Sequence, residues 1–310
     1  MKANDGIKTE GPRYRSSDRV RADRTDLLYK DIPEGGTLMS IKDLRVVYQT
    51  DDSEMVAVDN FSLDVKKGEL VSIIGPSGCG KTTILRCIAG LLQPTSGTIS
   101  MGGKPCTAPG SDRGMVFQDF ALFPWRSVKQ NVEFGMEVAG VPKEEREERA
   151  MRYIQAVGLG DFADSRIHEL SGGMKQRVGI ARALVMHPAV TLMDEPFGAL
   201  DAQTRNIMQE QLTRIIMHSE RTVIFITHSV DEALYLSDRV VILTKRPSTV
   251  YKVIDVPWNR PRDRACPEFT KLRRDILDFL ESQNVMSNDS GTVKKKPEMH
   301  LGDMFRSKEE

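Results

Sequence analysis

Long apolar segments are missing from this 310-residue sequence. No run approaches the roughly 20 apolar residues that a helix needs to cross a bilayer. The most apolar stretches, TVIFIT and VVILT, have the length of buried strands. Residues 1–25 are polar throughout and lack the apolar centre of a secretory signal. We therefore expect any role at a membrane to depend on a partner.

An excess of charge of one sign is also missing, because 44 lysines and arginines balance 44 aspartates and glutamates. Without a net field, the chain has no general attraction to nucleic acid or to an anionic membrane. Paired cysteines are absent as well, since the four that occur have neither CxxC nor zinc-like spacing. We interpret them as reduced thiols of a cytosolic protein. They are Cys79, Cys87, Cys106 and Cys266.

Three segments of different composition divide the chain. Residues 1–37 are polar and charged, and we expect a disordered tail there. Residues 38–250 carry apolar runs of strand and helix length. Residues 251–310 form a short extension, in which EFTKLRRDILDFLESQ is an amphipathic helix candidate and the end looks unstructured. The middle segment is therefore expected to hold the folded domain.

The middle segment has an α/β pattern. LMSIKDLRVVYQT and MVAVDNFSLDVKKG are strand candidates joined by the polar turn DDSE. ELVSIIG followed by GCGKTTILRCIAGLL is a strand, a glycine loop and a helix, which opens a parallel α/β domain. Helical stretches follow from about residue 120 to 170, and then the buried strands AVTLMDEP and TVIFITH flank a further helix. The capping-box spacing of Ser229 and Glu232 predicts that another helix begins there.

The glycine loop is a complete GxxxxGK[ST] motif at residues 75–82. Its glycines let successive backbone N–H groups face phosphate oxygens, and the following helix presents its positive end to them. Lys81 is placed to reach the β- and γ-phosphates, and the Thr82 hydroxyl to bind Mg²⁺. We predict a phosphate-binding site made of Gly75, Pro76, Ser77, Gly78, Cys79, Gly80, Lys81, Thr82 and Thr83.

Two carboxylates end the strand VTLMDE. A buried strand can deliver Asp194 to the shell of a Mg²⁺ ion at its carboxyl end. Glu195 is one residue further on and can polarise the attacking water, a role that contributes about 10²–10⁴ in rate. The alternative is a strand that ends in a solvated acidic turn.

A serine and two glycines open a predicted helix at residues 174–186. In the sequence LSGGMKQR, Ser171, Gly172 and Gly173 offer a hydroxyl, free N–H groups and a helix N-terminus to a second phosphate. One nucleotide needs only one phosphate loop, so we infer that two chains share each nucleotide. The alternative is a serine-capped helix with no ligand.

Together, the three motifs resemble the ABC ATPase family over about residues 38–250. The resemblance implies a P-loop NTPase (RecA-like) core with an antiparallel β subdomain and an α-helical subdomain inserted at about residues 119–171. It implies an enzyme that hydrolyses ATP with Mg²⁺ as a head-to-tail dimer. LSGGMKQR is similar to the family signature, which completes the ATP site of the partner chain.

The resemblance also gives roles to four further residues. Tyr48 matches the aromatic residue that stacks on adenine, and His228 matches the switch histidine that contacts the γ-phosphate. Gln118 matches the glutamine that touches Mg²⁺ and water and senses the membrane partner. Asp201, in Ala199-Leu200-Asp201, matches the family loop that crosses the dimer interface. The implied catalytic residues are Glu195, His228, Lys81 and Gln118, and the implied metal ligands are Thr82, Gln118 and Asp194.

Within the family, LFPW after Gln118 and the tail VPWNRPRDRACPEFTKLRRDILDFL are similar to importers of nitrate, sulfonates and taurine. This implies a homodimer or paired ATPase subunits, transmembrane permease subunits and, indirectly, a solute-binding protein. The chain would be a peripheral protein on the cytoplasmic face of the inner or plasma membrane. We expect the permease to dock on an apolar stretch formed by Phe120, Leu122, Phe123, Pro124 and Trp125, unless these residues pack inside the helical region.

The main alternative is a soluble ABC ATPase in translation or DNA repair. Translation-type members carry two ATPase units in one chain, and repair-type members carry a long coiled coil, and this sequence shows neither. A GTPase would need an NKxD motif, which the sequence lacks. An exporter would normally have membrane helices fused to this unit. The import subunit is therefore the preferred hypothesis.

Overall fold

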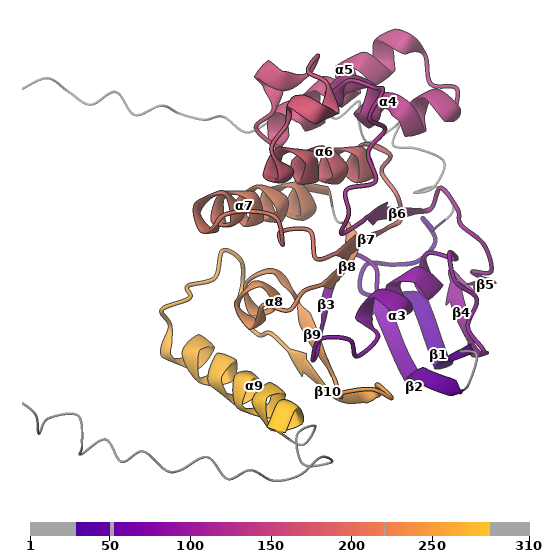
Figure 1. Ribbon diagram of the computed structural model, residues 1–310, viewed down its shortest axis with the longest axis vertical. Helices are drawn as coiled ribbons and strands as arrows, with labels where there is room; N and C mark the ends of the chain where they lie inside the picture. Colours follow the sequence, from indigo (N-terminus) through magenta and orange to yellow (C-terminus); the bar gives the residue numbers. More distant parts are fainter. Residues whose placement is uncertain (1–28, 50–52, 220, 286–310) are drawn as a thin grey trace, which may run out of the picture.

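The computed structural model of the chain describes residues 29–49, 53–219 and 221–285. These residues form two sheets, a group of helices at one end and a C-terminal helix on the side (Figure 1). Of the predicted unstructured segments, residues 1–28 and 286–310 lie outside the described part of the chain, as does part of the predicted turn at residues 51–54.

The described structure begins earlier than residue 38, where the folded domain was expected to start. Tyr29 is 7% exposed, and its hydroxyl donates a hydrogen bond to Asp112 Oδ2 at 3.0 Å. Lys67 Nζ donates to the carbonyl groups of Tyr29 and Ile32 at 3.2 Å and 2.9 Å. Residues 29–36 were predicted to belong to a disordered tail. They are part of the described fold instead, because the aromatic side chain of Tyr29 is buried.

The first sheet is antiparallel and contains the two long strands that the sequence predicts. In spatial order it consists of β2 (Glu54–Lys66), β1 (Thr37–Gln49), β4 (Ser96–Met101) and β5 (Lys104–Pro105). Side chains of β1 and β2 alternate between buried and exposed over much of their length, as expected for a sheet with one covered face. This is the predicted antiparallel β subdomain.

The second sheet is mostly parallel and forms the centre of the molecule. In spatial order it consists of β10 (Val250–Asp255), β9 (Arg239–Leu243), β3 (Leu70–Ile74), β8 (Thr222–Ile226), β7 (Val190–Asp194) and β6 (Arg113–Val116). All five residues of β3, β7 and β8 are buried, because helices or the other sheet cover both faces. Only β10 runs antiparallel to its neighbour.

The helices form a separate layer and a group at one end. They are α3 (Lys81–Ile88), α4 (Val128–Val138), α5 (Lys143–Ala156), α6 (Gly172–Val185), α7 (Ala202–Ser219), α8 (Val230–Leu236) and α9 (Pro267–Val285), with 3₁₀ turns η1 (Gly160–Phe162) and η2 (Ile167–Glu169). Figure 1 shows α4 and α5 lying together over α6. The helices α4 and α5 occupy the region in which a helical subdomain was predicted, and a capping box at Ser127 starts α4.

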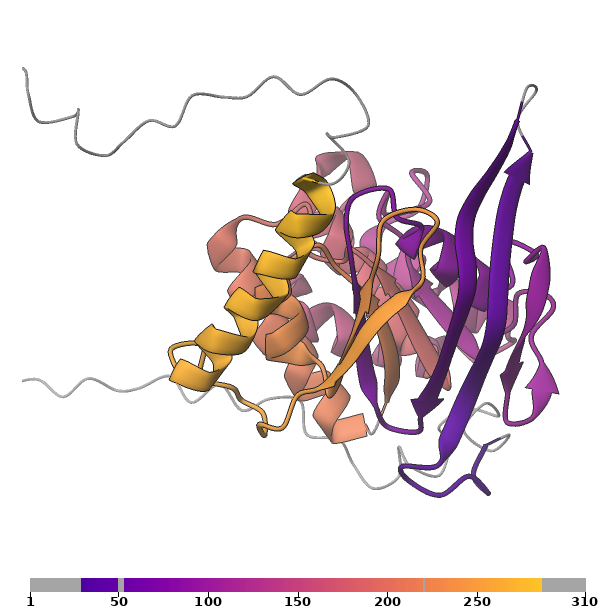
Figure 2. The ribbon, with the colours of Figure 1, turned by 90° about the horizontal axis from the view of Figure 1, so that it is seen from below.

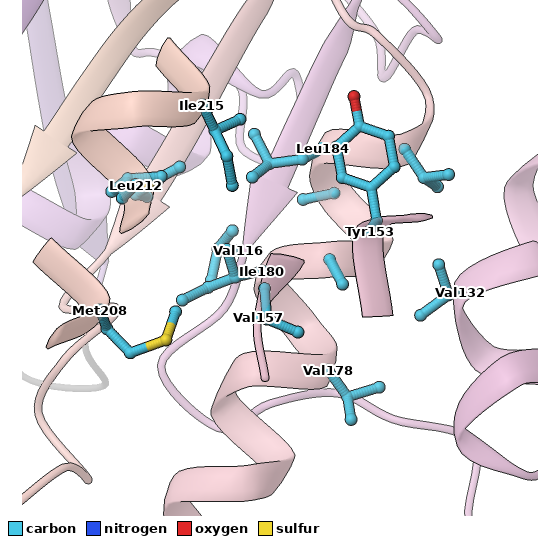
Figure 3. Packing of buried hydrophobic residues seen from close by; sticks show 14 of the residues in the cluster. Val116, Val132, Tyr153, Val157, Val178, Ile180, Leu184, Met208, Leu212 and Ile215 are labelled. Carbon is cyan, nitrogen blue, oxygen red and sulfur yellow. The ribbon is translucent and has the colours of Figure 1, made fainter. Parts of the chain in front are cut away.

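Three buried clusters join these parts. The largest packs α4, α5, α6 and α7 against the parallel sheet, and Figure 3 shows Tyr153, Ile180 and Leu212 within it. A second cluster places α3 between the two sheets, through residues such as Ile84 and Leu85. The helical region is therefore continuous with the core and not a loosely attached lobe.

The C-terminal helix packs on the side of the molecule away from β1 and β2 (Figure 2). Phe269 and Ile276 of α9 are buried against α8 and β9. This helix covers the segment that the sequence predicts to be amphipathic. In the described ranges, none of the helices combines the length and apolar character needed to span a membrane.

Candidate active site

The ends of four neighbouring parallel strands form the edge at which the predicted residues gather. β3, β8, β7 and β6 are adjacent in that order, and Ile226 of β8 lies opposite both Ile73 and Asp194. Because parallel strands end at the same edge, the segments that follow them lie together. The predicted residues that follow β3, β8, β7 and β6 are Lys81, His228, Glu195 and Gln118, respectively.

The phosphate loop encloses the end of a lysine side chain. Gly80, the N-cap of α3, has φ +105°, a left-handed conformation that favours glycine. Lys81 is 7% exposed, and its Nζ donates to the carbonyl groups of Gly75 and Pro76 at 2.9 Å and 3.0 Å. The charge of Lys81 is thus held inside the loop. The Cys79 thiol is buried behind it, and this burial raises the pKa of Cys79, which disfavours the reactive thiolate.

A hydroxyl and a carboxylate beside the loop fit a divalent cation. Thr82 Oγ1 donates to Asp194 Oδ1 at 3.2 Å, and Asp194 is 3% exposed. Burial raises the pKa of Asp194, and the hydrogen bond from Thr82 offsets part of that shift. Mg²⁺ usually takes one or two protein carboxylates and completes its shell with water and phosphate. Over the described ranges there is no cluster of three His, Cys, Asp or Glu side chains that could hold a metal ion. A Mg²⁺ ion at Asp194 would therefore depend on phosphate and water to complete its shell.

Glu195 and His228 form a pair at the same edge. Glu195 has φ +45°, which is uncommon for a residue with a side chain, and its N–H donates to the carbonyl of Ile226 at 3.0 Å. Its Oε2 lies 3.4 Å from His228 Nδ1. The His228 side chain is 64% exposed and that of Glu195 is 25% exposed. The pair therefore lies at the surface of the edge, unlike the buried Asp194.

Tyr48 approaches the phosphate loop from the antiparallel sheet. Its hydroxyl lies 3.1 Å from Thr83 Oγ1 in α3, and its ring is half-buried. Gln118 is exposed two residues beyond β6, the strand farthest from β3 among the four. The structure therefore brings the predicted adenine residue and the predicted phosphate residues together from different sheets.

The predicted signature does not join this group within the chain. Ser171 is exposed and caps α6, accepting a hydrogen bond from the Met174 N–H at 3.2 Å. Figure 1 shows α6 beside α4 and α5, with β6 and β7 between it and α3. A side chain on Gly172 would meet nothing within 4 Å, whereas a Cβ on Gly173 would lie 2.9 Å from Leu200 Cδ2. One glycine leaves the surface open and the other permits close packing.

The loop before α7 lies against this signature. A Cβ on Gly173 would also lie 3.7 Å from the carbonyl oxygen of Ala199. Asp201 is exposed and accepts hydrogen bonds from the N–H groups of Gln203 and Thr204 at 3.1 Å and 3.0 Å. These hydrogen bonds lower the pKa of Asp201. Asp201 thus caps α7, a local role that the family resemblance did not predict.

Two residues near the site were not predicted to belong to it. Arg246, in the loop after β9, places Nη2 3.8 Å from where a Cβ on Gly78 would lie, and no motif in the sequence marks it. Glu232 was considered only for its capping-box spacing with Ser229. Its N–H does donate to Ser229 Oγ at 3.3 Å, but its carboxylate turns inward to Thr227. The capping-box spacing in the sequence does not predict that this carboxylate is buried.

Relatives of known class cover most of the chain. The family model described as ABC transporter matches residues 58–198. The chain is 49% identical over 249 residues to the uncharacterized ABC transporter ATP-binding protein MJ0412 of Methanocaldococcus jannaschii, covering 80% of this chain and 93% of the relative. The chain belongs to the ABC transporter family.

Two other relatives of this ABC protein are named for import. It is 45% identical to the nitrate import ATP-binding protein NrtD of Synechocystis over 80% of this chain and 94% of the relative. It is 43% identical to the taurine import ATP-binding protein TauB of Roseobacter denitrificans over 79% of this chain and 94% of the relative. These similarities favour the import hypothesis over translation or DNA repair.

A solved structure confirms the fold. The chain resembles the dimeric, post-hydrolysis ATP-binding cassette MJ0796 bound to ADP and Pi, with a TM-score of 0.65 and 31% identity over 72% of this chain and 100% of that one. The predicted P-loop NTPase core with its two subdomains is therefore confirmed. The protein is an ATPase of the ABC type.

Proposed function

We propose that this ABC ATPase is the ATP-hydrolysing subunit of an importer for a small solute of the nitrate, sulfonate or taurine class. The observation that carries the proposal is the meeting of Lys81, Asp194, Glu195 and His228 at one sheet edge. The names of the nitrate and taurine import relatives support the solute class.

ATP binding would depend on the phosphate loop and on Tyr48. The Lys81 ammonium is already held inside the loop, so little side-chain freedom would be lost when it turns from backbone carbonyls to phosphate oxygens. Tyr48 would stack on the adenine, with its hydroxyl held by Thr83. Thr82, Asp194 and Gln118 would hold Mg²⁺, which when bound neutralises phosphate charge.

Glu195 would act as the general base in hydrolysis. Its backbone is fixed by the hydrogen bond to Ile226, so the carboxylate has a defined place at the strand end. It would accept a proton from the water whose oxygen attacks the γ-phosphorus, while the bond to the bridging β–γ oxygen breaks. His228, 3.4 Å from Glu195, would donate a hydrogen bond to the γ-phosphate.

The exposed signature would act on the nucleotide of a second copy of the chain. Ser171 and Gly172 present a hydroxyl and an open backbone at the N-terminus of the 14-residue helix α6, where the helix dipole favours an anion. A head-to-tail dimer would bring this surface to the partner's phosphate loop. Each ATP site would then need both chains.

Fewer residues of the predicted docking stretch are exposed than the sequence suggests. Leu122 packs against the helical core, and the Phe123 ring lies 4.4 Å from that of Phe134 between centroids. By contrast, Trp125 is 70% exposed and Pro124 is also exposed. An exposed tryptophan is a favoured contact at protein interfaces. We place permease docking at Trp125. As a subunit of an importer, the chain would act on the cytoplasmic face of the membrane, and it would reach any solute-binding protein through the permease.

The direct test is solute uptake in the source cells without the gene for this chain. Uptake of labelled nitrate, a sulfonate and taurine is measured after restoring either the wild type or Lys81→Ala. We expect loss of one of the three activities, restored only by the wild type. Unchanged uptake of all three would contradict the solute class.

A further inference from the structure

A buried glutamate lies directly behind the catalytic edge. Glu232 is in the first turn of α8, four residues after His228, and is 7% exposed. Burial raises the pKa of Glu232, and its hydrogen bonds and the nearby Arg205 and His228 offset part of that shift. A buried carboxylate is unfavourable for stability unless its partners compensate. The hydrogen-bond partners of the Glu232 carboxylate therefore indicate its role.

One oxygen of Glu232 holds the backbone on both sides of His228. Thr227 Oγ1 donates to Glu232 Oε2 at 2.5 Å. The same Thr227 hydroxyl accepts a hydrogen bond from the N–H of Ser229 at 3.0 Å. The two neighbours of His228 are thus joined to each other through one hydroxyl, and that hydroxyl is oriented by the carboxylate.

The other oxygen of Glu232 faces α7. Oε1 accepts a hydrogen bond from Gln209 Nε2 at 3.2 Å and lies 3.8 Å from Arg205 Nε. Arg205 Nη2 in turn donates to the carbonyl of Leu200 at 2.9 Å. Leu200 belongs to the loop that packs on Gly173 of the signature. One carboxylate therefore joins the His228 segment to the loop predicted to cross the dimer interface.

We propose that Glu232 is a positioning residue for ATP hydrolysis, which keeps His228 against Glu195 and fixes it relative to the loop that contains Leu200. The inference rests on the proposed role of His228. The His228–Glu195 contact of 3.4 Å is made by a side chain that is 64% exposed. Little packing fixes such a side chain, so its position depends on the backbone that Glu232 holds.

Glu232→Gln is the main test because it keeps the size of the side chain. An amide can accept from Thr227 only by turning its NH₂ towards Gln209 and Arg205, which are themselves donors. One of the two links is therefore lost. We expect kcat to fall about tenfold, equivalent to about 1.4 kcal/mol in the barrier. The KM for ATP and the affinity for ATP should stay unchanged, because the phosphate loop is not touched. Glu232→Asp, which keeps the charge, should retain more activity.

Asp231→Asn is the matched control. This substitution removes the same charge from the same turn, one residue before Glu232. Asp231, however, lies at the surface, where its Oδ1 is 2.8 Å from Arg273 Nε. Its kcat should equal that of the wild type. A loss of kcat in Glu232→Gln that disappears on cooling and follows the thermal midpoint would indicate a purely structural role and overturn the inference.

A double mutant separates this inference from the proposed function. Single-turnover hydrolysis of labelled ATP is compared in His228→Ala with and without Glu232→Gln. If Glu232 acts through His228, the second change should lower the residual rate less than twofold. A further tenfold loss in the double mutant would overturn the positioning role and leave the proposed function intact. Full activity of His228→Ala would instead contradict the role of the histidine in the proposed function, and the inference with it.

Discussion

At the scale of single residues, Glu195 is held in an unusual backbone conformation beside the histidine that it contacts. Such conformations persist where the surroundings impose them, and they concentrate at functional sites. Here the hydrogen bond to the Ile226 carbonyl of β8 holds the Glu195 backbone in this conformation.

We predict that Glu195→Gln keeps ATP binding and abolishes turnover, because the amide cannot accept the proton. Phosphate release and size-exclusion chromatography with ATP and Mg²⁺ should show an inactive, ATP-bound dimer. Normal hydrolysis by this variant would end the assignment.

Asp194 gives a second prediction at this scale, on stability without ligands. Its pKa is raised in the folded state, so the charged form destabilises the fold as pH rises through that pKa. Asp194→Asn should therefore stabilise the ligand-free protein at pH 7 by about 0.5–2 kcal/mol, a trade of stability for activity. Relative to this variant, the wild type should regain stability as pH falls towards the ordinary aspartate pKa. Urea unfolding at several pH values measures both, and a less stable Asp194→Asn at pH 7 would contradict this account.

At the scale of elements, the sequence predicts those strands whose burial is visible in their own residues. β3, β7 and β8 are buried at every position and are apolar or nearly so. β4 and β10 were missed because half or more of their residues are exposed and only their neighbours in the sheet make them strands. β6 was missed because four residues, RGMV, are too short a run to indicate a strand.

The same limit applies to the candidate site. The residues of the predicted phosphate loop are contiguous, so their spacing alone marks them, and in the structure they lie between β3 and the first turn of α3. Glu232 could not be recognised, because its contacts with Gln209 and Arg205 bring together segments that are distant in the sequence. Arg246 reaches the loop in the same way. Tertiary contacts of this kind leave no periodic pattern.

The aromatic stretch before α4 gives a prediction at the element scale. Trp125→Ala should leave stability within about 0.5 kcal/mol, because an exposed side chain is removed. Phe123→Ala should cost about 2–3 kcal/mol, less than the 3–5 kcal/mol of a fully buried phenylalanine, because Phe123 is half-buried against Phe134. Thermal unfolding, basal ATPase activity and co-purification with the permease are measured for both variants.

Only the permease complex should weaken in Trp125→Ala. A Trp125→Ala protein that unfolds early and still co-purifies with its permease would contradict docking at this residue. Phe123→Ala serves as the control for a change in the same stretch that acts through packing.

At the scale of the whole molecule, the sheet edge that carries Asp194 and Glu195 and the predicted signature are separate surfaces. Lys81, Thr82 and Asp194 converge, whereas Ser171 is exposed at the start of another helix beside the loop of residues 199–201. An anion-binding helix end without a local phosphate loop is accounted for if a second chain supplies the nucleotide. We therefore expect the active ATPase to be a dimer with shared sites.

A mixture of two inactive variants shows whether two chains share each ATP site. Ser171→Arg blocks the signature, Lys81→Ala disables the phosphate loop, and a mixed dimer keeps one intact shared site. We predict that each variant alone is inactive. The equimolar mixture should recover at most about a quarter of wild-type turnover, since half of the dimers are mixed and each keeps one of two sites; coupling between the sites would lower that recovery. Ser282→Arg, at an exposed position on α9, should remain fully active as a control. Full activity of Ser171→Arg alone would contradict the shared-site account.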